Sequence, residues 1–266
     1  MAHDDALYRN ICDHPDDDAP RLIYADWLEE HGDRARAEFI RVQLELAQIK
    51  YPYRNPNRWN GLAGRQNSLL LEHKRQWLGP LAELPFKWEF QRGFPATIIV
   101  DDLAWLRTHA DAALALAPVC RVWFRDTPEI QHYLDDHNWF VEPRIDDLDL
   151  SCITRFQEID ASNHHMGDDV LTLIVQALGG NIRWLSLANT AITQAGAAAI
   201  SAAPQLANLR ELNISGNKIG TGGARQLLES PHLKSLQELH AHHIGIDYRS
   251  KTARELRERF GEGLHW

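Results

Sequence analysis

The chain has 266 residues, of which 44% are hydrophobic and 24% are charged, the ordinary composition of a globular protein. Asp and Glu outnumber Lys and Arg by 37 to 28, which gives a formal net charge of -9. This composition excludes a disordered or collagen-like chain, and the negative charge makes nucleic acid and anionic membranes poor partners.

The N-terminal residues and the cysteines favour a cytoplasmic location. The first five residues lack the basic start and apolar run of a secretory signal, and the mostly apolar stretch 111–119 is too short to span a bilayer. The three cysteines, Cys12, Cys120 and Cys152, are widely spaced, as is typical of reduced thiols. We expect a cytoplasmic chain whose cysteines are buried and unreactive.

Residues 1–50 predict a helical module with 12 acidic and 6 basic side chains. Apolar residues at helical spacing indicate a first helix that ends before Pro15. Asp18 is the expected N-cap of a second helix, which Gly32 ends in a left-handed conformation. Asp33 then caps a third helix. Two helices joined by so short a turn form an antiparallel αα-hairpin.

Residues 51–95 are expected to form an ordered connector, because Tyr and Trp side chains are interspersed among its Pro and Gly residues. A helix is predicted from Gln66 to Leu78, where Gly79 and Pro80 stop it. Alternating apolar residues over 86–90 predict a strand, and the β-branched run 96–100 predicts another.

Internal repeats organise residues 96–266. The segment 209–217 fits the leucine-rich-repeat template L-x-x-L-x-L-x-x-N at every fixed position. The same apolar set starts again at Ile182, 27 residues earlier, and at Leu236, 27 residues later. It also starts at Phe156, 26 residues before Ile182. Helix formers follow each strand, at 168–178, 194–203 and 222–229. The sequence therefore predicts an α/β fold: a short curved solenoid with parallel strands inside and helices outside, preceded by the helical module.

The asparagine position of the repeat is imperfectly kept. Asn217 occupies it in one unit, and its equivalents are His164, Thr190 and Ile244. Thr and His can still bond a turn, whereas Ile cannot, so the last unit is interpreted as a capping repeat. A C-terminal helix over 248–260 is expected to close the stack.

The number of repeats before Phe156 stays open. The segments 119–127 and 145–150 both read as strands. The second lies too close to Phe156 to leave room for a helix, and the sequence does not decide which of the two is in register.

Residues 15–46 closely resemble the bacterial repeat-companion domain, most specifically in the run Pro-Arg-Leu-Ile-Tyr-Ala-Asp-Trp-Leu-Glu-Glu-His-Gly-Asp. The segment 88–94 is similar to one found in such proteins, and residues 156–247 resemble leucine-rich repeats of the ribonuclease-inhibitor-like class. These resemblances imply an architecture and a protein–protein interaction role. They carry over no catalytic residue.

The strand register predicts which side chains occupy the concave face, since alternate residues of a strand share a face. The third, fifth and seventh positions of each unit give Glu158, Asp160, Ser162, Trp184, Ser186, Ala188, Glu211, Asn213, Ser215, Glu238, His240 and His242. The segment 119–127 fits the repeat pattern more loosely, and we call it the looser unit. Its residues at the same three positions are Arg121, Trp123 and Arg125. A Trp among carboxylates is typical of a binding anchor with a polar rim. The alternative is a solvated face with Trp184 packed on its neighbours and the arginines stacked on aromatic rings.

The sequence predicts no metal site, no cofactor and no catalytic constellation. Only His240 and His242 face the same way, and a tight site needs three or four ligands. The Asp-rich run 13–18 lacks the Gly and Glu that a calcium loop requires. We therefore expect a non-enzymatic scaffold that binds a protein of unknown identity through its concave face. The alternative is a regulatory or inhibitory subunit of an effector enzyme.

Overall fold

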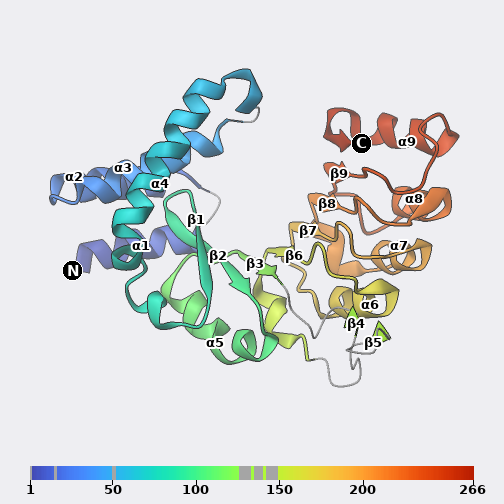
Figure 1. Cartoon of the computed structure of the whole chain (residues 1–266), viewed down its shortest axis with the longest axis horizontal. Coiled ribbons are helices and arrows are strands. Elements are labelled where there is room, and N and C mark those ends of the chain that lie inside the picture. The colour runs from blue at the N-terminus through green and yellow to red at the C-terminus, as the bar shows by residue number, and fades with distance from the viewer. Residues whose placement is uncertain (1, 15–16, 50–51, 126–132, 135–139, 142–148) are drawn as a thin grey trace. The chain divides into compact units, whose positions relative to one another are not determined.

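Short strands alternate with helices through the C-terminal half of the chain (Figure 1). The computed structural model describes residues 2–14, 17–49, 52–125, 133–134, 140–141 and 149–266. This described part is a mixed α/β fold with nine α-helices and an eight-stranded sheet of order β1-β2-β3-β6-β7-β8-β9-β10. It divides into unit 1 (Met1–Ile98 with His109–Cys120) and unit 2 (Ile99–Thr108 with Arg121–Trp266).

Unit 1 begins with three helices: α1 (Ala2–Asp13), α2 (Ala19–Glu30) and α3 (Arg34–Ala47). Asp33 caps α3 as predicted, because its carboxylate accepts a 3.0 Å hydrogen bond from the Arg36 backbone N–H. Gly32, at φ 93°, makes the turn between α2 and α3. Asp18 occupies the N-cap position of α2, but its side chain makes no capping hydrogen bond.

Arg36 lies in the core of unit 1 and is only 7% exposed. Its guanidinium Cζ lies 4.8 Å from the ring centroid of Trp77 and 5.3 Å from that of Phe94. Burial lowers the pKa of Arg36 to about 10, so the group stays charged at neutral pH. Cation–π attraction to these rings offsets part of the cost of burying the charge.

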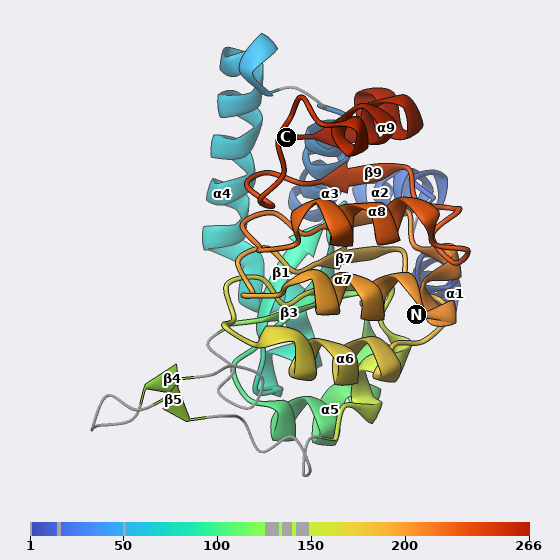
Figure 2. The same cartoon turned by 90° about the vertical axis from the view of Figure 1, so that its right-hand side faces the viewer.

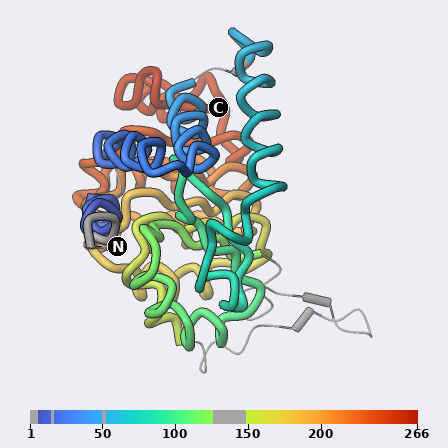
Figure 3. Tube along the Cα trace, turned by 90° about the vertical axis from the view of Figure 1, so that its left-hand side faces the viewer, coloured from blue at the N-terminus to red at the C-terminus, as the bar shows by residue number. Residues whose placement is uncertain are grey.

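Helix α4 (Pro56–Leu78) is longer than predicted, since it begins at Pro56 instead of Gln66. The side chain of Asn55 accepts a hydrogen bond from the Arg58 N–H at 3.3 Å, and Pro56 fits the first helical turn. A helix therefore forms although Gly61 and Gly64 favoured an irregular connector here. Figure 3 shows α4 in blue-green as one long, straight helix.

Strands β1 (Lys87–Gln91) and β2 (Phe94–Val100) follow the short 3-10 helix η2 (Gly79–Glu83). Arg92 and Gly93 join the two strands with φ angles of 50° and 90°, as a tight hairpin turn requires. A Cβ on Gly93 would lie 2.5 Å from Ile40, so only glycine fits against α3 here. Every residue of β2 is buried, and helix α5 (Leu103–Leu116) follows.

Unit 2 contains parallel strands in register: β3 (Arg121–Phe124), β6 (Glu158–Asp160), β7 (Trp184–Ser186), β8 (Glu211–Asn213) and β9 (Glu238–His240). Helices α6 (Gly167–Ala177), α7 (Gln194–Ser201) and α8 (Gly220–Glu229) follow β6, β7 and β8, close to the predicted ranges. Each helix packs on the next, and Figure 2 shows them stacked in a column. Strand β3 pairs with β6, which places Arg121–Phe124 of the predicted segment 119–127 in register.

Asn217 is buried and joins the segment after β8 to the segment after β7. Its amide N–H groups donate to the carbonyls of Leu187 (2.7 Å) and Ile214 (2.9 Å), and its oxygen accepts from the backbone N–H of Thr190 at 3.0 Å. Thr190 donates its hydroxyl to Leu187 O, and the His164 ring nitrogen Nδ1 lies 3.0 Å from the carbonyl oxygen of Ser162. The Thr and His equivalents of Asn217 therefore bond their own turns.

The C-terminus ends differently from the prediction. Helix α9 (Lys251–Phe260) packs on α8, but a short strand β10 (Leu264–His265) then pairs in parallel with β9. The sequence predicted the helix and not the strand, because two residues give no periodicity to recognise.

A small antiparallel pair, β4 (Tyr133–Leu134) and β5 (Phe140–Val141), lies between β3 and β6 in the chain. The segment 145–148 of the second looser strand lies outside the described residues. None of the described helices combines the length and apolar character needed to cross a bilayer.

Candidate functional site

The parallel register brings the predicted face residues together in two rows. The first row is Arg121, Glu158, Trp184, Glu211 and Glu238, and the second is Trp123, Asp160, Ser186, Asn213 and His240. The residues between the rows, such as Ile159 and Leu212, are fully buried on the opposite side of the strands. The face therefore has the composition and the order that the repeat spacing predicts. We call it the strand face.

Arg121 and Trp184 form the aromatic part of the strand face. The Arg121 Nε donates to Glu158 at 2.6 Å, and its Cζ lies 4.4 Å from the ring centroid of Trp184. Trp184 is partly buried and lies beside Glu211 in the strand register, where its indole helps to lower the pKa of that carboxyl. Its indole is thus held between a guanidinium and a carboxylate, with part of the ring open to solvent. This stacking is the arrangement that the alternative interpretation of Arg121 anticipates.

The other two residues of the looser unit do not contact Trp184 in the same way. Arg125 pairs weakly with Asp101, at 3.7 Å, and its Cζ lies 5.9 Å from the Trp123 ring centroid. Trp123 is partly buried. These two side chains extend the strand face with one more cation and one more ring.

Small polar side chains lie in the middle of the face. The hydroxyls of Ser162 and Ser186 are 2.7 Å apart, and Ser186 is only 3% exposed. Asp160 and Asn213 each accept a backbone N–H two residues on, from Ser162 and Ser215 respectively. These bonds fix local turns, so Asp160 and Asn213 have a structural role besides their exposure on the face.

Glu211 and His240 are coupled across β8 and β9. Their Oε1 and Nε2 atoms lie 3.0 Å apart, and hydrogen bonding by His240 and then Trp184 lowers the pKa of the Glu211 carboxyl. His265 of β10 stacks on His240 with ring centroids 4.3 Å apart, and its Nε2 lies 3.5 Å from Glu238. His242, by contrast, is exposed, and its backbone N–H donates to the Ser215 hydroxyl.

Sequence reasoning missed His265, because nothing in the C-terminal residues signals that they return to the strand face. In the structure, Tyr248 and Trp266 meet edge to face at 5.0 Å and so hold these residues in place. No pattern in the sequence connects these two rings.

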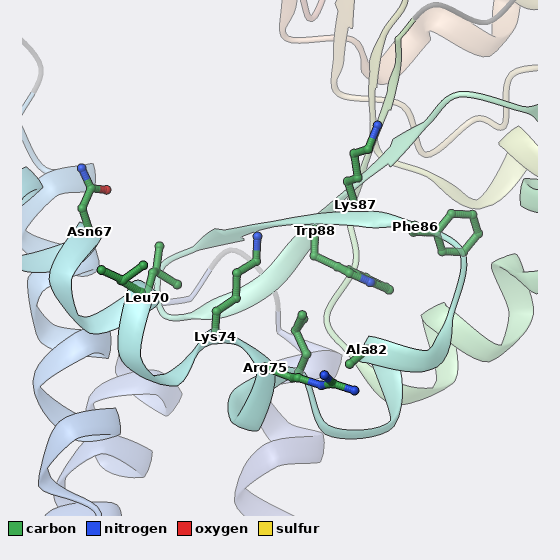
Figure 4. Close-up of a pocket in the computed structure, with 10 residues that line it drawn as sticks. Asn67, Leu70, Lys74, Arg75, Ala82, Phe86, Lys87 and Trp88 are labelled. Carbon is green, nitrogen blue, oxygen red and sulfur yellow. The ribbon is translucent and has the colours of Figure 1, made fainter.

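Unit 1 contains a separate groove that the sequence also did not predict. Its volume is about 720 Å³, and it is lined by ten residues, none of them acidic: Asn67, Leu70, Leu71, Lys74, Arg75, Leu78, Ala82, Phe86, Lys87 and Trp88. Figure 4 shows Leu70, Lys74 and Arg75 coming from α4, and Lys87 and Trp88 from β1. Leu71 is 88% exposed. The apolar floor and basic rim suit an apolar ligand that carries negative charge.

The three cysteines are partly buried, not fully buried as expected. Burial raises the pKa of both Cys12 and Cys152 to about 11. Because the thiolate is the nucleophile, these two side chains are unreactive at neutral pH.

No protein-family model and no curated protein matches this chain. The repeat-companion and leucine-rich-repeat resemblances therefore rest on the quoted residues alone.

Proposed function

We propose that this chain is a non-enzymatic interaction scaffold that binds a protein partner on the strand face. In this proposal unit 2 is a curved leucine-rich-repeat solenoid of the ribonuclease-inhibitor-like class, and the first 50 residues are a repeat-companion module. The regular parallel register and the successive helices support the repeat assignment. The net charge of -9 favours a protein partner over nucleic acid or a membrane. We also propose that the protein acts in the cytoplasm.

The observation that carries the proposal is the fixed position of Trp184. The Arg121 guanidinium stacks on the indole, and Glu211 lies beside it in the strand register, so little side-chain entropy is lost when a partner packs on Trp184. Trp and Arg are the residues most enriched at the centres of protein interfaces. The carboxylates of Glu158, Glu211 and Glu238 lie in the same row. A partner with a basic and partly apolar patch fits this surface.

A pull-down with the purified chain from the host lysate, followed by calorimetry with the purified partner, tests the proposal. Trp184→Ala and Glu211→Arg are expected to weaken binding by at least about tenfold, the usual cost of losing an interface anchor. Trp105→Ala and Glu258→Arg make the same chemical changes at exposed positions on α5 and α9, and should leave binding unchanged. Equal affinity of all four variants would move the binding site off the strand face.

The second candidate function is a regulatory or inhibitory subunit of an effector enzyme, and the groove of unit 1 favours it. Its three cations and the exposed Leu71 match an acidic, apolar segment of such an enzyme. Leu71→Glu would then abolish binding to that enzyme, whereas Leu22→Glu, at an exposed position of α2, would not. Loss of the partner by Trp184→Ala and not by Leu71→Glu would decide for the strand face.

A further inference from the structure

Strand β10 brings a second imidazole to the end of the strand face. His265 pairs with His240 in the β9–β10 register, and Glu238 precedes His240 by two residues on the same face. One nitrogen from each imidazole and one carboxylate oxygen lie within 4.8 Å of one another. The three side chains are neither fully buried nor fully exposed, so an ion from solvent can reach them.

The end of the chain is fixed firmly enough to hold His265 in place. The carbonyl of His265 accepts a 2.7 Å hydrogen bond from the Ala241 N–H. The next residue, Trp266, packs edge to face on Tyr248, and the Arg257 guanidinium lies 5.5 Å from its ring centroid. Gly263 approaches so closely that a Cβ there would lie 2.2 Å from the Gln237 carbonyl. The ligand cluster is therefore part of the fold and not a chance contact of a loose tail.

Among the described residues, neither Glu211 nor Glu238 forms a direct ion pair with a Lys or Arg side chain, and Arg121 acts on Glu211 only through a longer-range charge interaction. Glu211 and Glu238 occupy paired positions on β8 and β9, where like charges destabilise a sheet. Glu158 has a direct ion pair with Arg121. Within the described residues, the side chains placed against Glu211 and Glu238 are the Trp184 indole and the imidazoles of His240 and His265, which are neutral unless protonated.

His265 also has an unsatisfied ring nitrogen. Its Nε2 is buried and forms no hydrogen bond within the described part of the chain, although it lies 3.5 Å from the Glu238 carboxylate. Buried polar atoms are rarely left unpaired, and a bound ion is one of the standard explanations.

We propose that Glu238, His240 and His265 bind a divalent transition-metal ion, with zinc as the best chemical match. Two His and one Glu are a ligand set that zinc uses with a fourth position open, which Glu211 or water can fill. Ligand atoms on a tetrahedral zinc ion lie about 3.4 Å apart, given Zn–N distances of about 2.1 Å. Small rotations of the three side chains would shorten the distances between the ligand atoms from within 4.8 Å to this value. The same rotations would turn the stacked rings so that one nitrogen of each faces the ion.

The bound ion would neutralise the Glu211–Glu238 pair and tie β10 to β9. This inference does not depend on the proposed partner, since the ion is held by this chain alone.

Calorimetric titration of the tag-free, metal-stripped full chain with zinc chloride tests the proposal. We expect one zinc ion per chain, and a rise in the melting temperature when zinc is added. His265→Asn and Glu238→Gln should each lower the zinc affinity by at least about tenfold. His242→Asn, an exposed histidine outside the cluster, and Glu258→Gln on α9 are the matched controls and should stay within about twofold of the unmodified chain.

Cobalt(II) gives a second readout, because its visible spectrum reports the coordination geometry. A tetrahedral spectrum that disappears in His265→Asn supports the site. Absence of zinc binding by the unmodified chain, or binding that His265→Asn and Glu238→Gln leave unchanged, overturns it. Should His265→Asn fail to fold, Glu238→Gln carries the test, because Glu238 is a partly exposed side chain whose replacement keeps its shape.

Discussion

The Asn217 side-chain oxygen accepts a hydrogen bond from the Thr190 backbone N–H at 3.0 Å, and so links one repeat to the one before it. The same oxygen lies 3.2 Å from the Ile192 N–H, and the amide N–H groups donate to carbonyls on both sides. One buried side chain thus satisfies several backbone groups that no water can reach. This explains why the template position matters in the middle of the array.

Replacing Asn217 with alanine should lower the free energy of unfolding by about 3 kcal/mol. The estimate follows because each buried polar group left without a partner costs about 1–3 kcal/mol. Asn208→Ala is the control: Asn208 is exposed and donates one hydrogen bond to Gly180 O. Urea denaturation of both variants measures the difference, and equal loss of stability would show that the buried network contributes nothing special.

Gly196 is expected to tolerate no side chain. A Cβ at this position would lie 2.6 Å from the Asp168 carboxylate and 2.8 Å from the Leu171 methyl group, while the Gly196 N–H donates to that same carboxylate at 2.9 Å. Gly196→Ala should therefore destabilise unit 2 by about 1–3 kcal/mol through overpacking. Gly180→Ala meets open space and provides the comparison. If thermal unfolding finds the two variants equally stable, the close packing of α7 on α6 is not as described.

We expect that replacing Arg36 with lysine lowers the stability of the protein, although both side chains are cations. Its planar guanidinium faces the rings of Trp77 and Phe94, whereas an ammonium group cannot stack and is more strongly hydrated. Arg36→Lys should cost about 1–2 kcal/mol of stability. The exposed neighbour Arg34 offers the same substitution without the rings. Matching denaturation midpoints for the two variants would contradict a stabilising role for the buried guanidinium.

Glu211 should make stability depend on pH in the acid range. Hydrogen bonding by His240 and Trp184 lowers its pKa in the folded state below the unfolded value of about 4.3. Such a group stabilises the fold above the unfolded pKa, and the contribution is lost as the pH falls through the folded pKa.

Glu211→Gln should accordingly be less stable than the unmodified chain by about 1 kcal/mol at pH 7, a charged hydrogen bond reduced for its partly exposed setting. The gap should narrow as the pH falls below the unfolded pKa of about 4.3, and close once the pH lies below the folded pKa. Urea titrations at both pH values in the presence of EDTA measure it, with Glu258→Gln as the control for loss of one negative charge. A gap that stays constant with pH would disprove the hydrogen bonds to the carboxylate.

Much of the fold could be predicted because its determinants are local or periodic. Asp33 and Gly32 mark helix ends through backbone chemistry that needs no distant partner. The 26- and 27-residue spacing predicted that Glu158, Trp184, Glu211 and Glu238 would align, since equal repeats place equal positions side by side. The start of α4 was missed because Asn55 and Pro56 favour a helix start, whereas Gly61 and Gly64 weaken a helix. The sequence pattern does not show which of the two effects is larger.

The sequence by itself therefore determined the alternation of strands and helices from β6 to α9, and the row of side chains on the strand face. Only the tertiary structure decided that Arg121 stacks on Trp184, that α4 and β1 leave a basic groove, and that His265 returns beside His240. Each of these three features brings together residues that are distant in sequence, such as Arg121 and Trp184. Their contact therefore depends on how the whole chain packs. Periodicity reports which face a residue occupies, whereas the identity of its neighbour across a long separation is fixed only when the whole core is assembled.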